Sequence, residues 1–157
     1  MGPYVAVIGP GEASEVEEES AEAVGRALAG AGAIVVTGGL GGVMAAACRG
    51  AALAGGLTVG FLPGTDRRAA NAWVKVALPT GLGELRNGLV VRAADAVIAV
   101  GGAYGTLAEV ALALKAGTPV VGLSTWPIVG VREADHPAGA VEQALAAAVH
   151  RVSGSSR

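Results

Sequence analysis

The chain has 157 residues, and 52% of them are hydrophobic, which is enough to build one domain around a single core. The formal net charge is only −2 and aromatic residues make up 3% of the chain, so both the basic surface and the stacking platforms of nucleic-acid-binding proteins are missing. We therefore expect one domain over residues 1–152, a flexible tail at 153–157 and no nucleic-acid partner.

Cysteine usage and the start of the chain favour a cytoplasmic protein. Cys48 is the single cysteine, so no internal disulfide can form, and no Cys/His cluster has metal-ligand spacing. The chain enters an apolar segment at Tyr4 without the basic region and apolar run of a secretory signal. Residues 38–64 are nearly free of charge, but glycines divide them into turns and short elements. We expect no metal site and no membrane span.

Short apolar runs rich in Val and Ile alternate with amphipathic segments along the chain. The runs predict strands at 4–8, 33–37, 58–62, 73–78, 96–100 and 118–123. The segments between and after them predict helices at 15–31, 42–54, 83–93, 107–116 and 137–149. This alternation predicts an α/β fold with a single doubly wound, mainly parallel sheet of about six or seven strands and helices on both faces.

Ligands of such sheets bind beyond the carboxyl ends of the strands, so the glycine-containing strand-to-helix turns are the candidate sites. The first turn begins with GPG at 9–11 but has Ser14 where a dinucleotide fingerprint has its third glycine. Ser14 and Glu17 form a capping box, and glutamates crowd residues 12–19, where they would repel a phosphate. We regard this turn as a poor phosphate site. The strand at 33–37 also ends without an acidic residue for a ribose, which argues against a nicotinamide-dependent enzyme.

The second turn, TGGLGGVM at 37–44, has no acidic residue near its helix start. Because glycine has no Cβ, an anion or a flat ring can approach the main chain closely here. The predicted ligand contacts in this turn are Gly38, Gly39, Gly41, Gly42 and Met44.

In the third turn, an apolar strand runs through GGAYGT at 101–106 directly into a helix. The free N–H groups at a helix start bind anions, and Thr106 can add its hydroxyl. Glu109, one turn later, is positioned to direct a carboxylate into the cleft. The alternative is that Thr106 and Glu109 form a T-x-x-E capping box, and the sequence leaves both interpretations open. The predicted contacts here are Gly101, Gly102, Ala103, Tyr104, Gly105, Thr106 and Glu109.

Two further predicted ligand contacts, Arg86 and Asn87, lie in the helix that precedes the third turn. A guanidinium binds a phosphate through two parallel hydrogen bonds, so Arg86 is a candidate phosphate ligand. The alternative is a solvated surface arginine, which is the more common situation for an arginine taken alone.

Four ordered motifs, TGGLGGVM (37–44), RGAALAGGLTVGFLPG (49–64), TGLGELRN (80–87) and GGAYGTLAE (101–109), carry a family resemblance. The chain resembles the LOG-like, "lysine decarboxylase-like" superfamily, most closely its branch that includes molybdenum cofactor carrier proteins. The resemblance implies a Rossmann-like domain and a homodimer or larger homo-oligomer. Nothing in the chain suggests a pyridoxal-binding lysine, so the decarboxylase label is not expected to describe its chemistry.

LOG enzymes carry the signature P-G-G-x-G-T-x-x-E after an M-x-x-R-K segment, and its arginine and final glutamate serve hydrolysis of nucleoside 5′-monophosphates. Arg86 and Glu109 occupy the matching positions. Asn87 stands where the lysine belongs, Gly101 replaces the proline and Ala103 replaces a glycine. The R-N form at Asn87 matches the carrier-like branch.

Two functions follow from this resemblance. In the first, the protein binds a phosphorylated nucleotide- or pterin-like molecule, such as the molybdenum cofactor, with the phosphate on Gly102, Gly105 and Thr106 and the ring near Gly39 and Gly41. In the second, it is a phosphoribohydrolase that releases free base and ribose 5-phosphate from a nucleoside monophosphate, with Arg86 and Glu109 as catalytic residues. We favour the carrier, and whether the protein is an enzyme stays open.

Overall fold

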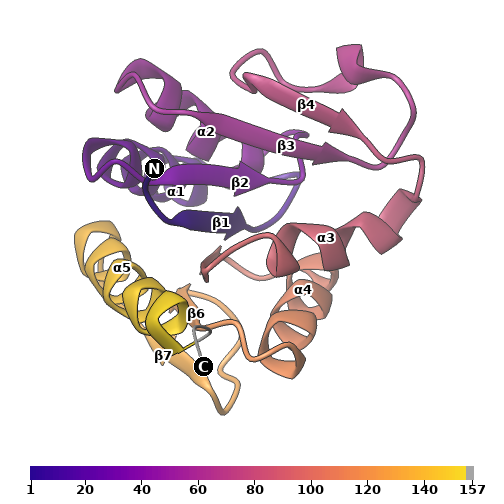
Figure 1. Ribbon diagram of the computed structural model, residues 1–157. Coiled ribbons are helices and arrows are strands. Elements are labelled where there is room, and N and C mark those ends of the chain that lie inside the picture. Colours follow the sequence, from indigo (N-terminus) through magenta and orange to yellow (C-terminus); the bar gives the residue numbers. More distant parts are fainter. Residues whose placement is uncertain (155–157) are drawn as a thin grey trace.

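The computed structural model describes residues 1–154, which form one parallel sheet between two layers of helices (Figure 1). The strands are β1 (Tyr4–Ile8), β2 (Ile34–Thr37), β3 (Thr58–Leu62), β4 (Val76–Pro79), β5 (Ala96–Val100), β6 (Val120–Leu123) and β7 (Val131–Glu133). The α-helices are α1 (Glu15–Gly30), α2 (Val43–Leu53), α3 (Asn87–Arg92), α4 (Tyr104–Lys115) and α5 (Pro137–Gly154). Two 3-10 helices, η1 (Arg67–Ala69) and η2 (Gly83–Arg86), complete the described elements. The predicted α/β fold is confirmed.

The strand order is β4-β3-β2-β1-β5-β6-β7, and every neighbouring pair is parallel. The chain runs outward from β1 to β4 and then returns to the other side of β1, where β5 pairs with it. The order therefore reverses between β1 and β5, which is where open parallel sheets form their ligand sites.

Side chains alternate between the two faces of the sheet, as the twofold periodicity of a strand requires. Val5 and Val7 of β1 pack in the core cluster that includes residues of α1, α2 and α5. Ala6 and Ile8 pack in a second cluster with residues of α3 and α4. Both faces of β1 are buried, which explains why its sequence is apolar throughout rather than alternating.

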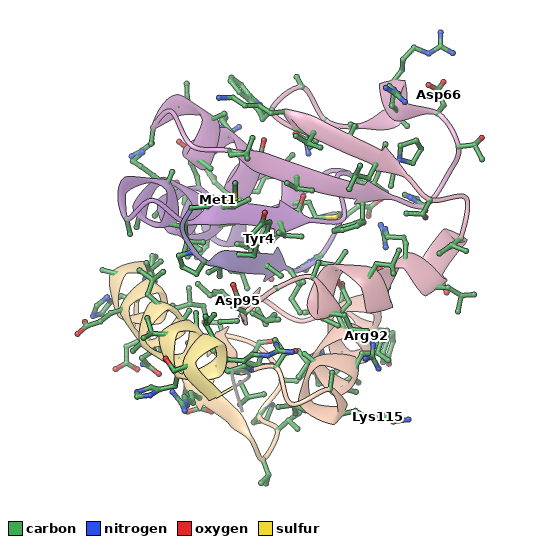
Figure 2. All side chains as sticks on the ribbon, viewed as in Figure 1. Met1, Tyr4, Asp66, Arg92, Asp95 and Lys115 are labelled. Atoms are coloured by element: carbon green, nitrogen blue, oxygen red, sulfur yellow. The ribbon has the colours of Figure 1, made fainter. Side chains whose placement is uncertain are left out.

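Where the strands begin, a polar contact joins Tyr4 of β1 to Asp95, the residue before β5 (Figure 2). The carboxylate of Asp95 accepts a hydrogen bond from the main-chain N–H of Tyr4 at 2.9 Å, and the N–H of Asp95 donates to the carbonyl of Tyr4 at 2.7 Å. Asp95 therefore has a structural role.

The structure departs from the expected elements in several places. The segment 83–93, expected as one helix, is a 3-10 turn, η2, followed by the six-residue α3. Strand β7 was not predicted, because only one of its three residues is apolar. The strand at 73–78 begins instead at Val76, because the hydroxyl of Thr58 binds the carbonyl of Trp73 at 2.7 Å. Helix α4 begins at Tyr104, three residues before the expected start.

Helix α5 runs through Gly154, so it includes the first two residues of the segment expected to be a tail. Residues 155–157 of that segment lie outside the described part of the chain. Across the described residues, none of the helices combines the length and the apolar character that crossing a bilayer requires.

Candidate functional site

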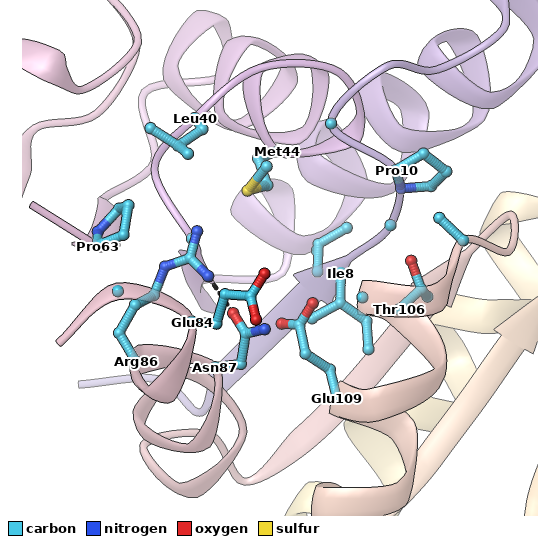
Figure 3. Close-up of a pocket in the computed structure, with 17 residues that line it drawn as sticks. Ile8, Pro10, Leu40, Met44, Pro63, Glu84, Arg86, Asn87, Thr106 and Glu109 are labelled. Carbon is cyan, nitrogen blue, oxygen red and sulfur yellow. Dashed lines mark hydrogen bonds between the residues drawn. The ribbon is translucent and has the colours of Figure 1, made fainter.

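A cavity of about 410 Å³ opens at the carboxyl ends of β1, β2 and β3 and beside the start of α4 (Figure 3). It therefore lies at the reversal of strand order between β1 and β5. Its lining consists of Val7, Ile8, Gly9, Pro10, Gly11, Gly38, Leu40, Met44, Pro63, Gly83, Glu84, Arg86, Asn87, Ala103, Gly105, Thr106 and Glu109.

Arg86 forms one wall of the cavity. It is the last residue of η2 and only 9% exposed, so the alternative of a solvated surface arginine is wrong. One terminal nitrogen donates to the side-chain oxygen of Asn87, whereas Nε is buried without a partner among the described residues. Burial lowers the pKa of Arg86, and the carboxyl groups of Glu109 and Glu84 oppose that shift. An arginine stays cationic in this situation and keeps donors available for an anion.

Thr106 lies on the opposite wall, in the first turn of α4. The residue is 1% exposed, and its hydroxyl has no hydrogen-bond partner among the described residues. Leaving such a group unpaired in the folded state costs about 1–3 kcal/mol. The first main-chain N–H groups of a helix also lack intrahelical partners, so this wall offers donors to an acceptor in the cavity.

Glu109 is one helical turn beyond Thr106 on the same helix, and Figure 3 shows its carboxyl group directed from α4 toward Arg86 and Asn87. Burial raises the pKa of Glu109 to about 7, although the charge of Arg86 works in the opposite direction. The capping interpretation is wrong: α4 begins at Tyr104, and its N-cap residue Ala103 makes no side-chain capping bond. The earlier helix start moves both Thr106 and Glu109 inside the helix, where they face the cavity.

Of the other residues predicted in the third turn, Ala103 and Gly105 line the cavity and three face elsewhere. Gly101 has a φ of 69°, and the side chain of Glu17 fills the space that a Cβ at Gly101 would need. Gly102 packs against Trp126, and the indole N–H of Trp126 donates to the carbonyl of Ala103 at 3.1 Å. Tyr104 is 82% exposed and stacks on Trp126 with 6.1 Å between ring centroids. These three predicted contacts do not line the cavity.

In the second turn, the structure brings Gly38 and Met44 to the cavity but not the other three predicted glycines. Gly39 is buried, Gly41 is exposed and Gly42 is the N-cap of α2. The turn therefore contributes the main chain at the end of β2 and one flexible apolar side chain, rather than a run of bare glycines.

Sequence reasoning missed the contribution of the first turn, 9–11, which lines the cavity on the β1 side. The signal was available in the topology, because β1 is the central strand and its carboxyl end must border the reversal of strand order. The capping box of Ser14 and Glu17 is confirmed, with Glu17 accepting from the N–H of Ser14 at 2.8 Å. Leu40, Pro63, Gly83 and Glu84 were also missed, although each lies within one of the motifs that carry the family resemblance, because a motif does not say which of its residues face the cavity.

The cavity combines one guanidinium, two carboxyl groups, one unpaired hydroxyl and an apolar wall. Within residues 1–154, no group of three or more His, Cys, Asp or Glu side chains is arranged to hold a metal ion. The chemistry that the lining offers is hydrogen bonding to an anion beside a surface suited to a flat apolar ring.

Comparison with known proteins gives consistent matches along the chain. The model of the SLOG cluster4 family matches residues 2–152. An uncharacterized protein of Archaeoglobus fulgidus is 40% identical over 146 residues, which cover 92% of this chain and 96% of that protein.

Two solved structures share the fold closely. The molybdenum cofactor binding protein of Rippkaea orientalis is 37% identical, with a TM-score of 0.86 over 91% of this chain and 95% of that chain. The Moco carrier protein of Chlamydomonas reinhardtii is 38% identical, with a TM-score of 0.84 over 98% of this chain and 99% of that chain.

Proposed function

Because the chain belongs to the SLOG cluster4 family, we propose that it binds a phosphorylated pterin- or nucleotide-like molecule in the cavity between β1 and β5 and acts as a carrier. The observation that carries this proposal is a pair of buried donors in one cavity, the Thr106 hydroxyl and Arg86 Nε, neither of which has a partner in the described part of the chain. Unpaired buried polar groups are rare in folded proteins and call for an explanation, and a bound anion supplies one.

The phosphate would sit between Arg86 and the start of α4, accepting hydrogen bonds from Thr106 and from free main-chain N–H groups. The ring would lie on the apolar part of the lining, which includes Leu40, Met44 and Pro63. The likeness to two proteins named for binding or carrying the molybdenum cofactor makes that compound the first cargo to test.

A second candidate function is the hydrolysis of nucleoside 5′-monophosphates. It is favoured by Glu109, a carboxyl group in the cavity with its pKa raised to about 7, near the value that suits proton transfer at neutral pH. In this reaction Glu109 would deprotonate the attacking water or stabilise positive charge on the ribose, while Arg86 holds the phosphate.

Incubation with AMP, GMP and cytokinin ribotides separates the two functions. We expect no free base by chromatography, together with measurable binding of a phosphorylated compound by the wild type and weak binding by Arg86→Ala. Native mass spectrometry of the purified protein would then identify any small molecule that it retains. Release of free base by the wild type but not by Glu109→Gln would overturn the carrier assignment in favour of the hydrolase.

We also propose that the protein is a homo-oligomer. Val76 and Leu78 of β4 pair with Val59 and Phe61 of β3, which pack on the side of α3 and α4, yet both β4 residues remain 39% exposed. Leu85, in η2, is 79% exposed. A second copy of the chain that covers these residues would remove apolar surface from water.

A further inference from the structure

The charges that line the cavity disfavour a phosphate monoester as long as both carboxyl groups of the lining are ionised. Arg86 is the only cationic side chain in the lining contributed by the described residues, whereas Glu84 and Glu109 add two carboxyl groups. The lining is therefore net negative when both carboxyl groups are ionised. A phosphate dianion that enters the cavity meets a like charge on the same wall that offers it the Thr106 hydroxyl.

The two carboxyl groups differ in their surroundings. Glu84 is exposed on η2, where water screens its charge. Glu109 is half-buried on α4, one turn from Thr106 and across the cavity from Arg86. In an enclosed site, two like charges at close range disfavour each other strongly, and one of them takes up a proton. Glu109 is the group in position to do so.

We propose that binding of a phosphate monoester drives ionised Glu109 to take up a proton from solvent, so that the bound state contains a neutral carboxylic acid facing the ligand. This inference rests on the proposed function of the cavity and adds that binding and release are linked to pH. The proton is transferred to a carboxylate oxygen of Glu109, and no other bond is made or broken. The neutral acid gains a donor that an ionised carboxylate lacks.

Among the titratable groups near the proposed phosphate, Glu109 is the one placed to bind this proton. From η2 it faces Arg86, whose charge lowers the pKa of Glu109, and Glu84, whose side chain is exposed. From the β1–α1 segment, Glu12 is exposed outside the lining, and Glu17 is bonded to the main chain of Ser14. The β3–β4 loop contributes no charged side chain to the lining, and none of the lining residues from 1–154 is a His, Lys or Cys.

The ionisation of Glu109 before any ligand binds is consistent with this role. Its pKa of about 7 means that the carboxyl group is roughly half protonated at neutral pH. An approaching phosphate needs to shift this equilibrium only modestly to complete the protonation. A neutral Glu109 would hold cargo but could not act as the base of a hydrolase, so the same proton favours carriage over turnover.

Isothermal titration calorimetry with GMP tests the linkage, using the wild type, Glu109→Gln and Glu12→Gln. At pH 7, titrations in two buffers of different ionisation enthalpy count the protons taken up. The phosphate of GMP titrates as well, so the readout is the difference between variants. We expect the wild type and Glu12→Gln to take up roughly half a proton more than Glu109→Gln. The affinity of the wild type relative to Glu109→Gln should fall by roughly tenfold between pH 6 and pH 8.5.

A second measurement needs no variant: NMR titration of the Glu109 side-chain carboxyl carbon should show its midpoint at a higher pH with GMP than without it. Equal proton uptake and equal pH profiles for the wild type and Glu109→Gln, with binding still dependent on Arg86, would overturn the linkage and leave the carrier proposal standing. If neither GMP nor any other phosphate monoester binds the wild type, both proposals fall.

Discussion

The guanidinium of Arg86 lies directly over the main chain of Gly38, at the end of β2. A Cβ built on Gly38 would come within 3.0 Å of Nη2 of Arg86 and 2.8 Å of Sδ of Met44. The absence of a side chain at Gly38 therefore lets Arg86 lie against the end of β2 and line the cavity. Two motifs that are almost fifty residues apart in the chain meet at this contact.

Gly38→Ala should displace the guanidinium and weaken binding of phosphate monoesters by about tenfold, the equivalent of one charge-assisted hydrogen bond. The clash involves the far ends of two flexible side chains, so the fold should remain intact. Calorimetry with GMP measures the affinity, and thermal unfolding measures the stability. Gly30→Ala is the matched control, because a Cβ there has no neighbour within 4 Å. Equal affinities for the two variants would show that Arg86 does not need this position.

Thr106→Val should separate binding from stability. The substitution keeps the shape of the side chain but removes a buried hydroxyl that has no hydrogen-bond partner within residues 1–154. Its loss should leave thermal stability unchanged or slightly higher, while affinity for phosphate monoesters falls by about five- to tenfold. A loss of stability with unchanged affinity would instead mean that the hydroxyl serves the fold.

The fold could be predicted because its signal is local. The strand 96–100 is a continuous apolar run bounded by turn residues, and such runs alternate regularly with amphipathic segments. The short edge strand Val131–Glu133 could not be predicted in this way, since it has one apolar residue and pairs with a single neighbour, β6. The start of α4 at Tyr104 was missed because the T-x-x-E pattern at Thr106 imitates a capping box.

The site was predicted only in part, because a cavity depends on contacts between distant segments. The resemblance pointed to Arg86 and Glu109, and both line the cavity. Glycine patterns identified turns but not the direction in which each turn faces, so Gly101 and Gly102 were expected in a site that they do not line. The neighbours that decide those directions, Glu17 and Trp126, lie on other elements of the chain.

Glu109→Gln should change how stability depends on pH. The folded state raises the pKa of Glu109 from 4.5 to about 7, so it holds this proton more tightly than the unfolded chain does. The stability linked to this proton is fully present below pH 4.5 and is lost as the pH rises through 7. The free energy of unfolding of the wild type should therefore decline over this range relative to Glu109→Gln, by on the order of 2 kcal/mol.

Urea unfolding of both proteins at pH 5, 6, 7 and 8 measures this difference. Glu12→Gln, which alters an exposed carboxyl group outside the cavity, should follow the wild type. Parallel curves for the wild type and Glu109→Gln would contradict the raised pKa and with it the half-protonated state at neutral pH.

Leu85→Glu should dissociate the proposed oligomer. Leu85 is 79% exposed in η2 and Leu78 is 39% exposed on the partly uncovered face of β4, so an interface here would remove both from water. A charge placed inside such an interface costs far more than the same charge on a free surface. Sedimentation velocity should show the wild type as an oligomer and Leu85→Glu as a monomer with an unchanged circular dichroism spectrum.

Val16→Glu is the matched control for this experiment. Val16 is 71% exposed on α1, on the face of the sheet opposite to α3 and α4, so its substitution should leave the oligomer intact. Because Leu85 precedes the cavity residue Arg86 directly, loss of the oligomer should also reduce affinity for GMP if the neighbouring copy orders η2. A wild type that sediments as a monomer would remove the oligomer from the proposal and leave the exposed leucines without an assigned role.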